Sequence, residues 1–263
     1  MKLARKGTSL LLGELRRMRK RVIELESIQP PGNLVETETE ALLELISLLS
    51  SADDCHALPE SLIVYLRNWS GCEAVGIRLR YGYDFPYYET SGFPEKFVLL
   101  ENNLCLQDSR GQLVKDGSGR AVLECMCGNV IDGRIDPSLE FFTDFGSFWT
   151  NSTTELLRST TRAQRQSRTR NRCNGEGYES VALIPLRFAQ DRFGLLQFND
   201  RRKGHFTPEK IVLLERIAAN ITHHLSGRKD DVRSLMILNE KEILLHRIFD
   251  SLRSEPGRIA GSF

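Results

Sequence analysis

The chain has 263 residues and a mass of 30.0 kDa, with 36 Lys and Arg side chains against 35 Asp and Glu. Its formal net charge of +1 excludes a protein that binds nucleic acid or a membrane surface through its overall charge. The sequence contains no apolar run near the roughly 18 residues that a membrane-spanning helix needs. The apolar stretch that follows its basic first residues is interrupted by charged residues, so we do not expect a signal peptide. We therefore expect a cytoplasmic protein whose partners are neither nucleic acid nor membrane.

The first predicted helix, residues 10–26, carries a narrow apolar seam at alternating steps of four and three residues. The seam consists of Leu11, Leu15, Met18, Val22 and Leu25. This is the period of a coiled coil, so we expect a homodimer, although a helix packed on its own domain would fit as well. Two prolines and a glycine at 30–32 then break the helix. Residues 1–33 are accordingly predicted to form an N-terminal coiled-coil arm and linker.

Two more helices are predicted before the first strand. One begins near Thr37 among acidic residues, and the other follows Pro59. Residues 74–80 alternate apolar and polar side chains, which predicts a strand. The aromatic-rich segment 81–93 predicts a turn and a second strand, and Pro94 starts a short helix.

Residues 102–150 are predicted to be an irregular insertion punctuated by glycines. Within it, residues 123–131 and 147–150 are candidate strands. The short polar side chains at 151–155 predict a helix cap. The arginine-rich segment 158–172 is interpreted as a solvated face, because the chain as a whole is neutral.

The last part of the domain predicts a β-hairpin and a long helix. Its strands cover residues 179–188 and 193–199, and Pro185 places the first strand at an edge or distorts it there. Thr207 is predicted to cap the long helix. A further amphipathic helix is predicted from Asp230.

The sequence resembles the GAF family of sensory domains in this last part and in its middle. Three segments carry the resemblance: Tyr178–Leu186 with Ile-Pro-Leu, Phe193–Asn199 with Gly-Leu-Leu, and Phe206–Glu209 with Phe-Thr-Pro-Glu. The cysteine-bearing middle resembles a version found in bacterial sensor histidine kinases, on residues Leu123–Gly128 and Gly146–Ser152.

The resemblance implies an α+β fold with a GAF-like antiparallel sheet and helices on one face. The sensory domain would cover residues 34–228, followed by a C-terminal helical extension and tail at 229–263. It also implies a regulatory module without catalytic residues, and therefore not an enzyme. Such a domain binds a small-molecule or redox ligand between sheet and insertion, and signals through flanking dimer helices. No kinase or cyclase motif is present, so the predicted partner is another signalling protein, such as a kinase or response regulator. The alternative is a GAF-fold dimerisation module with no cofactor.

Four of the six cysteines fall in the predicted ligand-binding region: Cys105, Cys125, Cys127 and Cys173. In an extended strand Cys125 and Cys127 would face the same side. With Cys105 and Cys173 they could form a four-sulfur metal site for zinc or an iron–sulfur cluster. Two alternatives stay open, namely a thiol–disulfide switch and buried cysteines that only fill space.

The remaining metal-ligating residue types give weaker patterns. Cys55 and Cys72 lie beside predicted helix ends and are interpreted as structural. His223 and His224 are adjacent on a helix and do not share a face, which makes them a poor chelate. The five histidines leave a haem ligand open.

Overall fold

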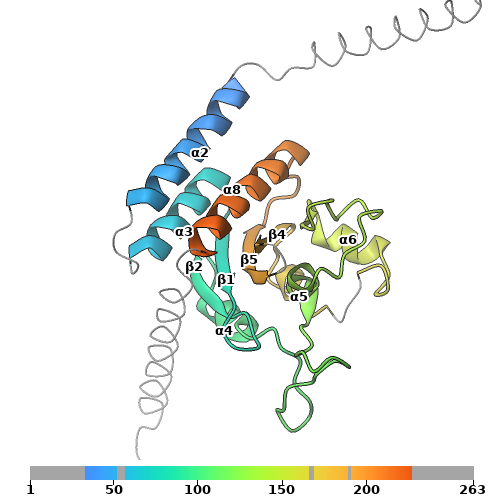
Figure 1. The fold of residues 1–263 in the computed structure, drawn as a ribbon. Coiled ribbons are helices and arrows are strands. Elements are labelled where there is room, and N and C mark those ends of the chain that lie inside the picture. Colours follow the sequence, from blue (N-terminus) through green and yellow to red (C-terminus); the bar gives the residue numbers. More distant parts are fainter. Residues whose placement is uncertain (1–32, 52–56, 166–168, 189–190, 227–263) are drawn as a thin grey trace, which may run out of the picture. The chain divides into compact units, whose positions relative to one another are not determined.

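The computed structural model describes residues 33–51, 57–165, 169–188 and 191–226 (Figure 1). The predicted coiled-coil seam, the extension 229–263 and Cys55 lie outside these residues. The chain divides into two compact units, Met1–Leu43 and Glu44–Phe263, with the division inside helix α2 (Asn33–Ser51). Within the described ranges no helix combines the length and the apolar character needed to cross a membrane.

A five-stranded antiparallel sheet forms the centre of the second unit. Its strands follow the order β2-β1-β5-β4-β3. The bounds are Ala74–Leu79 for β1, Tyr87–Ser91 for β2, Phe148–Thr150 for β3, Ser180–Phe188 for β4 and Asp191–Asp200 for β5. The predicted α+β class and the final hairpin are therefore confirmed. Because β1 pairs with both β2 and β5, the first and last strands of the domain lie side by side.

The long helices α3 (Ala57–Ser70) and α8 (Pro208–Ser226) pack on one face of this sheet, as predicted (Figure 1). The backbone N–H of Lys210 donates to Thr207 Oγ1 at 3.3 Å, so Thr207 caps α8. Four shorter helices complete the fold: α4 (Glu95–Glu101), α5 (Cys125–Asp132), α6 (Thr153–Ser159) and α7 (Arg172–Gly175). Helix α5 packs against β4 and β5. Its Met126 lies in one core cluster with Val181 and Leu183 of β4.

The predicted strand at residues 123–131 is wrong, because these residues form helix α5. A short apolar run does not distinguish a helix from a strand by periodicity. Packing decides here: a Cβ atom at Gly128 would lie 2.7 Å from Leu123 Cβ, so the glycine lets the first helical turn fold back onto Leu123. The helix ends at Gly133 in the left-handed conformation, with φ 69°. Cys125 and Cys127 therefore do not share the face of a strand.

Pro185 lies where the sheet is locally an edge. Strand β4 runs between β5 and β3, but the register of the short β3 covers only Val181–Leu183. Pro185 pairs with Leu195 of β5 on the other side. The missing N–H of proline therefore costs no hydrogen bond to β3.

Candidate functional site

A chain of buried polar side chains crosses the face of the sheet that lies toward α5. Tyr87 on β2 donates from its hydroxyl to Gln197 Oε1 on β5 at 2.9 Å. Gln197 Nε2 in turn donates to Asn199 Oδ1 at 3.1 Å. The guanidinium of Arg78 on β1 lies 3.6 Å from the centre of the Tyr87 ring. Side chains two apart on a strand share a face, and this explains why Gln197 and Asn199 lie together.

Arg78 is the largest fully buried side chain of the domain, with 0% of its surface exposed. Its two terminal nitrogens donate to the backbone oxygens of Phe85 at 3.0 Å, Glu101 at 2.7 Å and Asn102 at 3.1 Å. These carbonyls belong to the segments around β2 and α4. Arg78 thus fixes both segments on β1 and places a positive charge under the polar chain.

Two cysteines contact Gln197, the middle residue of this row of polar side chains, and a third lies beside them. Gln197 Oε1 lies 3.9 Å from Cys127 Sγ, and Gln197 Nε2 lies 3.8 Å from Cys173 Sγ. Cys125 is hydrogen-bonded to Cys127. All three thiols line one cavity of about 60 Å³. The rest of its wall is largely apolar and includes Met126, Phe148, Leu156, Leu157, Val181 and Leu183.

Cys105 lies apart from these three thiols. It faces the β1–β2 turn, where its Sγ is 3.3 Å from the backbone oxygen of Tyr83, and its backbone bridges to Leu123. Burial, followed by the charge of Asp84, raises the pKa of Cys105 to about 12. Among the described residues, no group of three or more His, Cys, Asp and Glu side chains is arranged to hold a metal ion. Cys105 is not among the thiols that line the cavity, and the four-sulfur site for zinc or an iron–sulfur cluster stays a prediction.

Cys125 differs from the other cysteines in its acidity. A hydrogen bond from the Cys127 thiol, together with backbone N–H donors of Arg170 and Met126, lowers the pKa of Cys125 to about 7 against burial. Donating that hydrogen bond raises the pKa of Cys127 well above 9.0, and burial acts in the same direction. Burial raises the pKa of Cys173 to about 12. The cavity thus combines one thiol that ionises near neutral pH with two that stay protonated.

The backbone of Cys125 is held in the left-handed region, with φ 65°. A residue with a Cβ atom pays on the order of 1–3 kcal/mol for such a conformation, and it persists only where its surroundings impose it. The same residue therefore carries both the strained backbone and the lowered pKa. This coincidence makes Cys125 the candidate for a reactive group in the cavity.

The arginine-rich segment is the predicted solvated face only in its first part, where Arg158 and Arg162 are exposed. Arg170 pairs with Glu124 at 3.1 Å, and Arg172 pairs with Glu101 at 2.6 Å. Only 3% of the surface of Glu101 is exposed. These ion pairs fasten residues 169–175 to α4 and to the start of α5. Glu124 directly precedes Cys125, so the sequence shows a charged residue beside the cysteines. Its partner Arg170 lies 46 residues further along the chain, and the sequence does not reveal that pairing.

We expect the variant Glu124→Ala to raise the pKa of Cys125 from about 7 toward the ordinary thiol value of 9.0. Without its ion pair Arg170 loses one anchor, and the backbone N–H of Arg170 then holds the Cys125 thiolate less firmly. The pH dependence of Cys125 alkylation, followed by mass spectrometry, measures this shift. Glu155→Ala is the matched control, because it breaks an exposed ion pair with Arg158 at 2.6 Å on α6. Equal profiles for both variants would contradict the prediction.

The predicted structural role of Cys72 fits its position. Only 4% of its surface is exposed, and burial raises its pKa to about 11. His205 Nε2 contacts the backbone oxygen of Ser70 at 3.0 Å, and burial lowers the pKa of His205. His223 and His224 lie in the last turn of α8. His223 is exposed there and His224 is half-buried, and the haem site stays a prediction.

Comparison with known proteins identifies the fold. No family model matches the sequence, and no curated protein matches it. The GAF domain of a phosphoenolpyruvate-protein phosphotransferase from Coxiella burnetii is 12% identical with a TM-score of 0.50, over 74% of this chain and 96% of that chain. A protein from Burkholderia vietnamiensis named as a putative GAF sensor is 13% identical with a TM-score of 0.48, over 72% of this chain and 94% of that chain. The chain therefore has the GAF fold that its hairpin and last helix predict.

The prediction that the chain is not an enzyme is contradicted by the same comparison. A free methionine-R-sulfoxide reductase from Neisseria meningitidis is 11% identical with a TM-score of 0.48, over 74% of this chain and 91% of that chain. The GAF fold thus occurs in proteins named as enzymes as well as in sensors. The fold alone does not separate the two, and the function has to be argued from the site.

Proposed function

We propose that this chain is a thiol-based regulatory domain, whose input is the oxidation state of Cys125. The observation that carries the proposal is the cavity in which Cys125, with its pKa lowered to about 7, meets two protonated thiols. A thiolate is the nucleophilic form of cysteine, and a second thiol nearby can trap its oxidised form. The proposal selects the redox alternative among the interpretations that the sequence left open.

The oxidant proposed is a hydroperoxide. The Cys125 thiolate attacks one peroxide oxygen, so that a sulfur–oxygen bond forms while the oxygen–oxygen bond breaks. The leaving oxygen takes up a proton and departs as water or an alcohol, which leaves a sulfenic acid on Cys125. A second thiol then displaces this hydroxyl as water and forms a disulfide. Cys173 is the preferred second thiol, because a disulfide between Cys125 and Cys127 would be strained over so short a loop.

Oxidation of Cys125 can affect the sheet through the contact of Cys173 with Gln197. Cys173 contacts Gln197, and Gln197 belongs to the strand β5 that pairs with both β1 and β4. On its other face β4 packs against α8. Drawing Cys173 toward Cys125 would therefore disturb Gln197, the central strands and α8. As part of the proposal, the output passes through a homodimer to a signalling partner such as a kinase or response regulator.

Titration of the reduced full-length chain with hydrogen peroxide tests the proposal. We expect one disulfide that includes Cys125, identified by peptide mapping, and its loss in Cys125→Ser. Cys72→Ser is the control, because Cys72 is buried outside this cavity. Unchanged peroxide consumption in Cys125→Ser would refute the assignment. Zinc or iron bound in stoichiometric amounts after anaerobic purification would instead favour the four-sulfur metal site.

A second arm of the experiment replaces the peroxide by free methionine-R-sulfoxide, the compound in the name of the Neisseria meningitidis reductase. Consumption of at most one equivalent of this oxidant per chain would fit a regulatory domain. Continued turnover with a dithiol reductant, lost in Cys125→Ser, would make the chain an enzyme and replace the proposal.

A further inference from the structure

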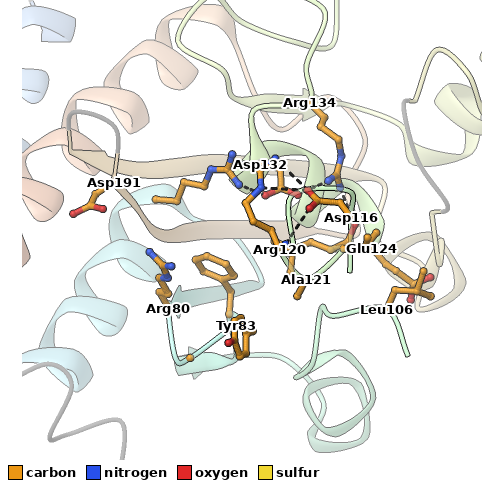
Figure 2. Close-up of a pocket in the computed structure, with 16 residues that line it drawn as sticks. Arg80, Tyr83, Leu106, Asp116, Arg120, Ala121, Glu124, Asp132, Arg134 and Asp191 are labelled. Carbon is orange, nitrogen blue, oxygen red and sulfur yellow. Dashed lines mark hydrogen bonds and ion pairs between the residues drawn. The ribbon is translucent and has the colours of Figure 1, made fainter. Parts of the chain in front are cut away.

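A second and larger cavity, of about 940 Å³, lies where the β1–β2 turn, the loop 106–124, the end of α5 and the start of β5 meet (Figure 2). Its lining, in the part of the chain that the structure describes, includes no cysteine. A volume of this size matches the cavities of about 300–1,000 Å³ that bind small molecules. The proposed thiol chemistry leaves this cavity without a role.

Charged side chains make up half of the residues that line this cavity. It is lined by the guanidinium groups of Arg80, Arg120, Arg134 and Arg192 and by the carboxylates of Asp116, Glu124, Asp132 and Asp191. Two of the carboxylates are neutralised by one arginine each. Asp116 pairs with Arg120 at 3.2 Å, and Glu124 pairs with Arg170, which lies outside the lining, at 3.1 Å.

The Asp132 carboxylate is surrounded by more positive charge than it can balance. Its carboxylate, 14% exposed, is hydrogen-bonded to both Arg134 and Arg192. Arg187 lies close to the same group: burial lowers the pKa of Arg187, and the charge of Arg192 lowers it further. A single carboxylate cannot neutralise three guanidinium groups, so an excess of positive charge remains at this end of α5.

Arg80 adds a guanidinium that is available to a ligand. The residue is exposed at the end of β1, and its side chain has no hydrogen bond or ion pair among the described residues. In Figure 2 it lies on the same side of the cavity as Tyr83. The Tyr83 side chain is 61% exposed and offers an apolar surface. The apolar surface of Tyr83 beside Arg80 favours an anion with an apolar body.

We propose that this cavity binds a small organic anion, with a carboxylate or phosphate group between Arg80 and Arg192 and its apolar part on Tyr83. Guanidinium groups recognise both anions through paired hydrogen bonds. The anion neutralises the charge excess around Asp132, so binding stabilises the arginine cluster. The proposal goes beyond the thiol chemistry and does not depend on it.

Calorimetric titration of the full-length chain with citrate, benzoate and pyrophosphate tests the site, with chloride at matched ionic strength as reference. We expect saturable binding of at least one of the three anions, weakened at least tenfold in Arg80→Ala. Citrate or benzoate would identify a carboxylate ligand, and pyrophosphate a phosphate ligand. Arg110→Ala is the matched control, because Arg110 is exposed on the same loop but outside the cavity lining.

Two results would overturn the site. One is the absence of saturable binding by all three anions. The other is an equal loss of affinity in Arg80→Ala and Arg110→Ala, which would point to general charge attraction. Arg192→Ala is a second variant for the anion-affinity measurement. It removes one partner of Asp132, while Arg134 keeps that carboxylate paired. Circular dichroism confirms that each variant is folded. The readout is anion affinity, so failure of the thiol proposal leaves this test unaffected.

Discussion

Replacing Arg78 by methionine is expected to lower the free energy of unfolding by about 3–5 kcal/mol. Methionine fills much of the same space, but it leaves two buried carbonyls and one half-buried carbonyl of the backbone without the donors that Arg78 supplies. Each unsatisfied buried acceptor costs about 1–3 kcal/mol. The variant also loses the contact of the guanidinium with the Tyr87 ring. Urea denaturation followed by circular dichroism measures the loss.

Arg80→Met is the matched control for this experiment. Arg80 lies two residues further along the chain, but it is exposed, and its side chain has no partner among the described residues. An exposed substitution of this kind changes stability by about 0.5 kcal/mol or less. If the two variants lost equal stability, the structural role assigned to Arg78 would be wrong.

The alkylation of Cys125 is expected to have its midpoint near pH 7, two pH units below that of a thiol with the ordinary pKa of 9.0. At pH 7 half of Cys125 is thiolate, against roughly 1% of an ordinary thiol, which gives a roughly fifty-fold advantage. A thiolate of lower pKa is less nucleophilic, by roughly eightfold over two units, so the net advantage at equal access is about sixfold. Because access also affects the rate, the midpoint is the more decisive measurement.

Mass spectrometry after pulses of iodoacetamide between pH 5 and 10 gives this midpoint for Cys125. Cys72 is the internal control, because burial raises its pKa to about 11 and it should remain unmodified through most of the range. A Cys125 midpoint near pH 9 would contradict the three-donor arrangement around the thiolate.

The same pKa shift makes a small contribution to stability that depends on pH. The folded-state pKa of Cys125, about 7, lies below its unfolded value of 9.0. The folded state therefore releases its proton more readily, and the contribution is complete above pH 9. It is lost as the pH falls from 9 through 7. Comparing the stability of the chain with that of Cys125→Ser across this range isolates the effect.

Local sequence patterns were enough to predict the class of fold and the strands of the sheet. Alternating apolar residues identified β1, and the Ile-Pro-Leu and Gly-Leu-Leu segments identified β4 and β5. Such local patterns survive folding because the period of two is fixed by the strand geometry itself. The sequence also directed attention to Cys125, Cys127 and Cys173, which line one cavity.

The chemistry of that cavity depends on tertiary contacts that no local sequence pattern predicts. Whether residues 123–131 form a strand or a helix depends on the packing of Gly128 against Leu123, which periodicity does not report. The acidity of Cys125 depends on a donor from Arg170, a residue anchored by Glu124, which lies 46 positions earlier. In the sequence Cys105 was as good a candidate for the site as the other three cysteines, but in the structure it faces the β1–β2 turn. Contacts between residues so far apart in the chain arise from the fold, so spacing in the sequence could not rank these thiols.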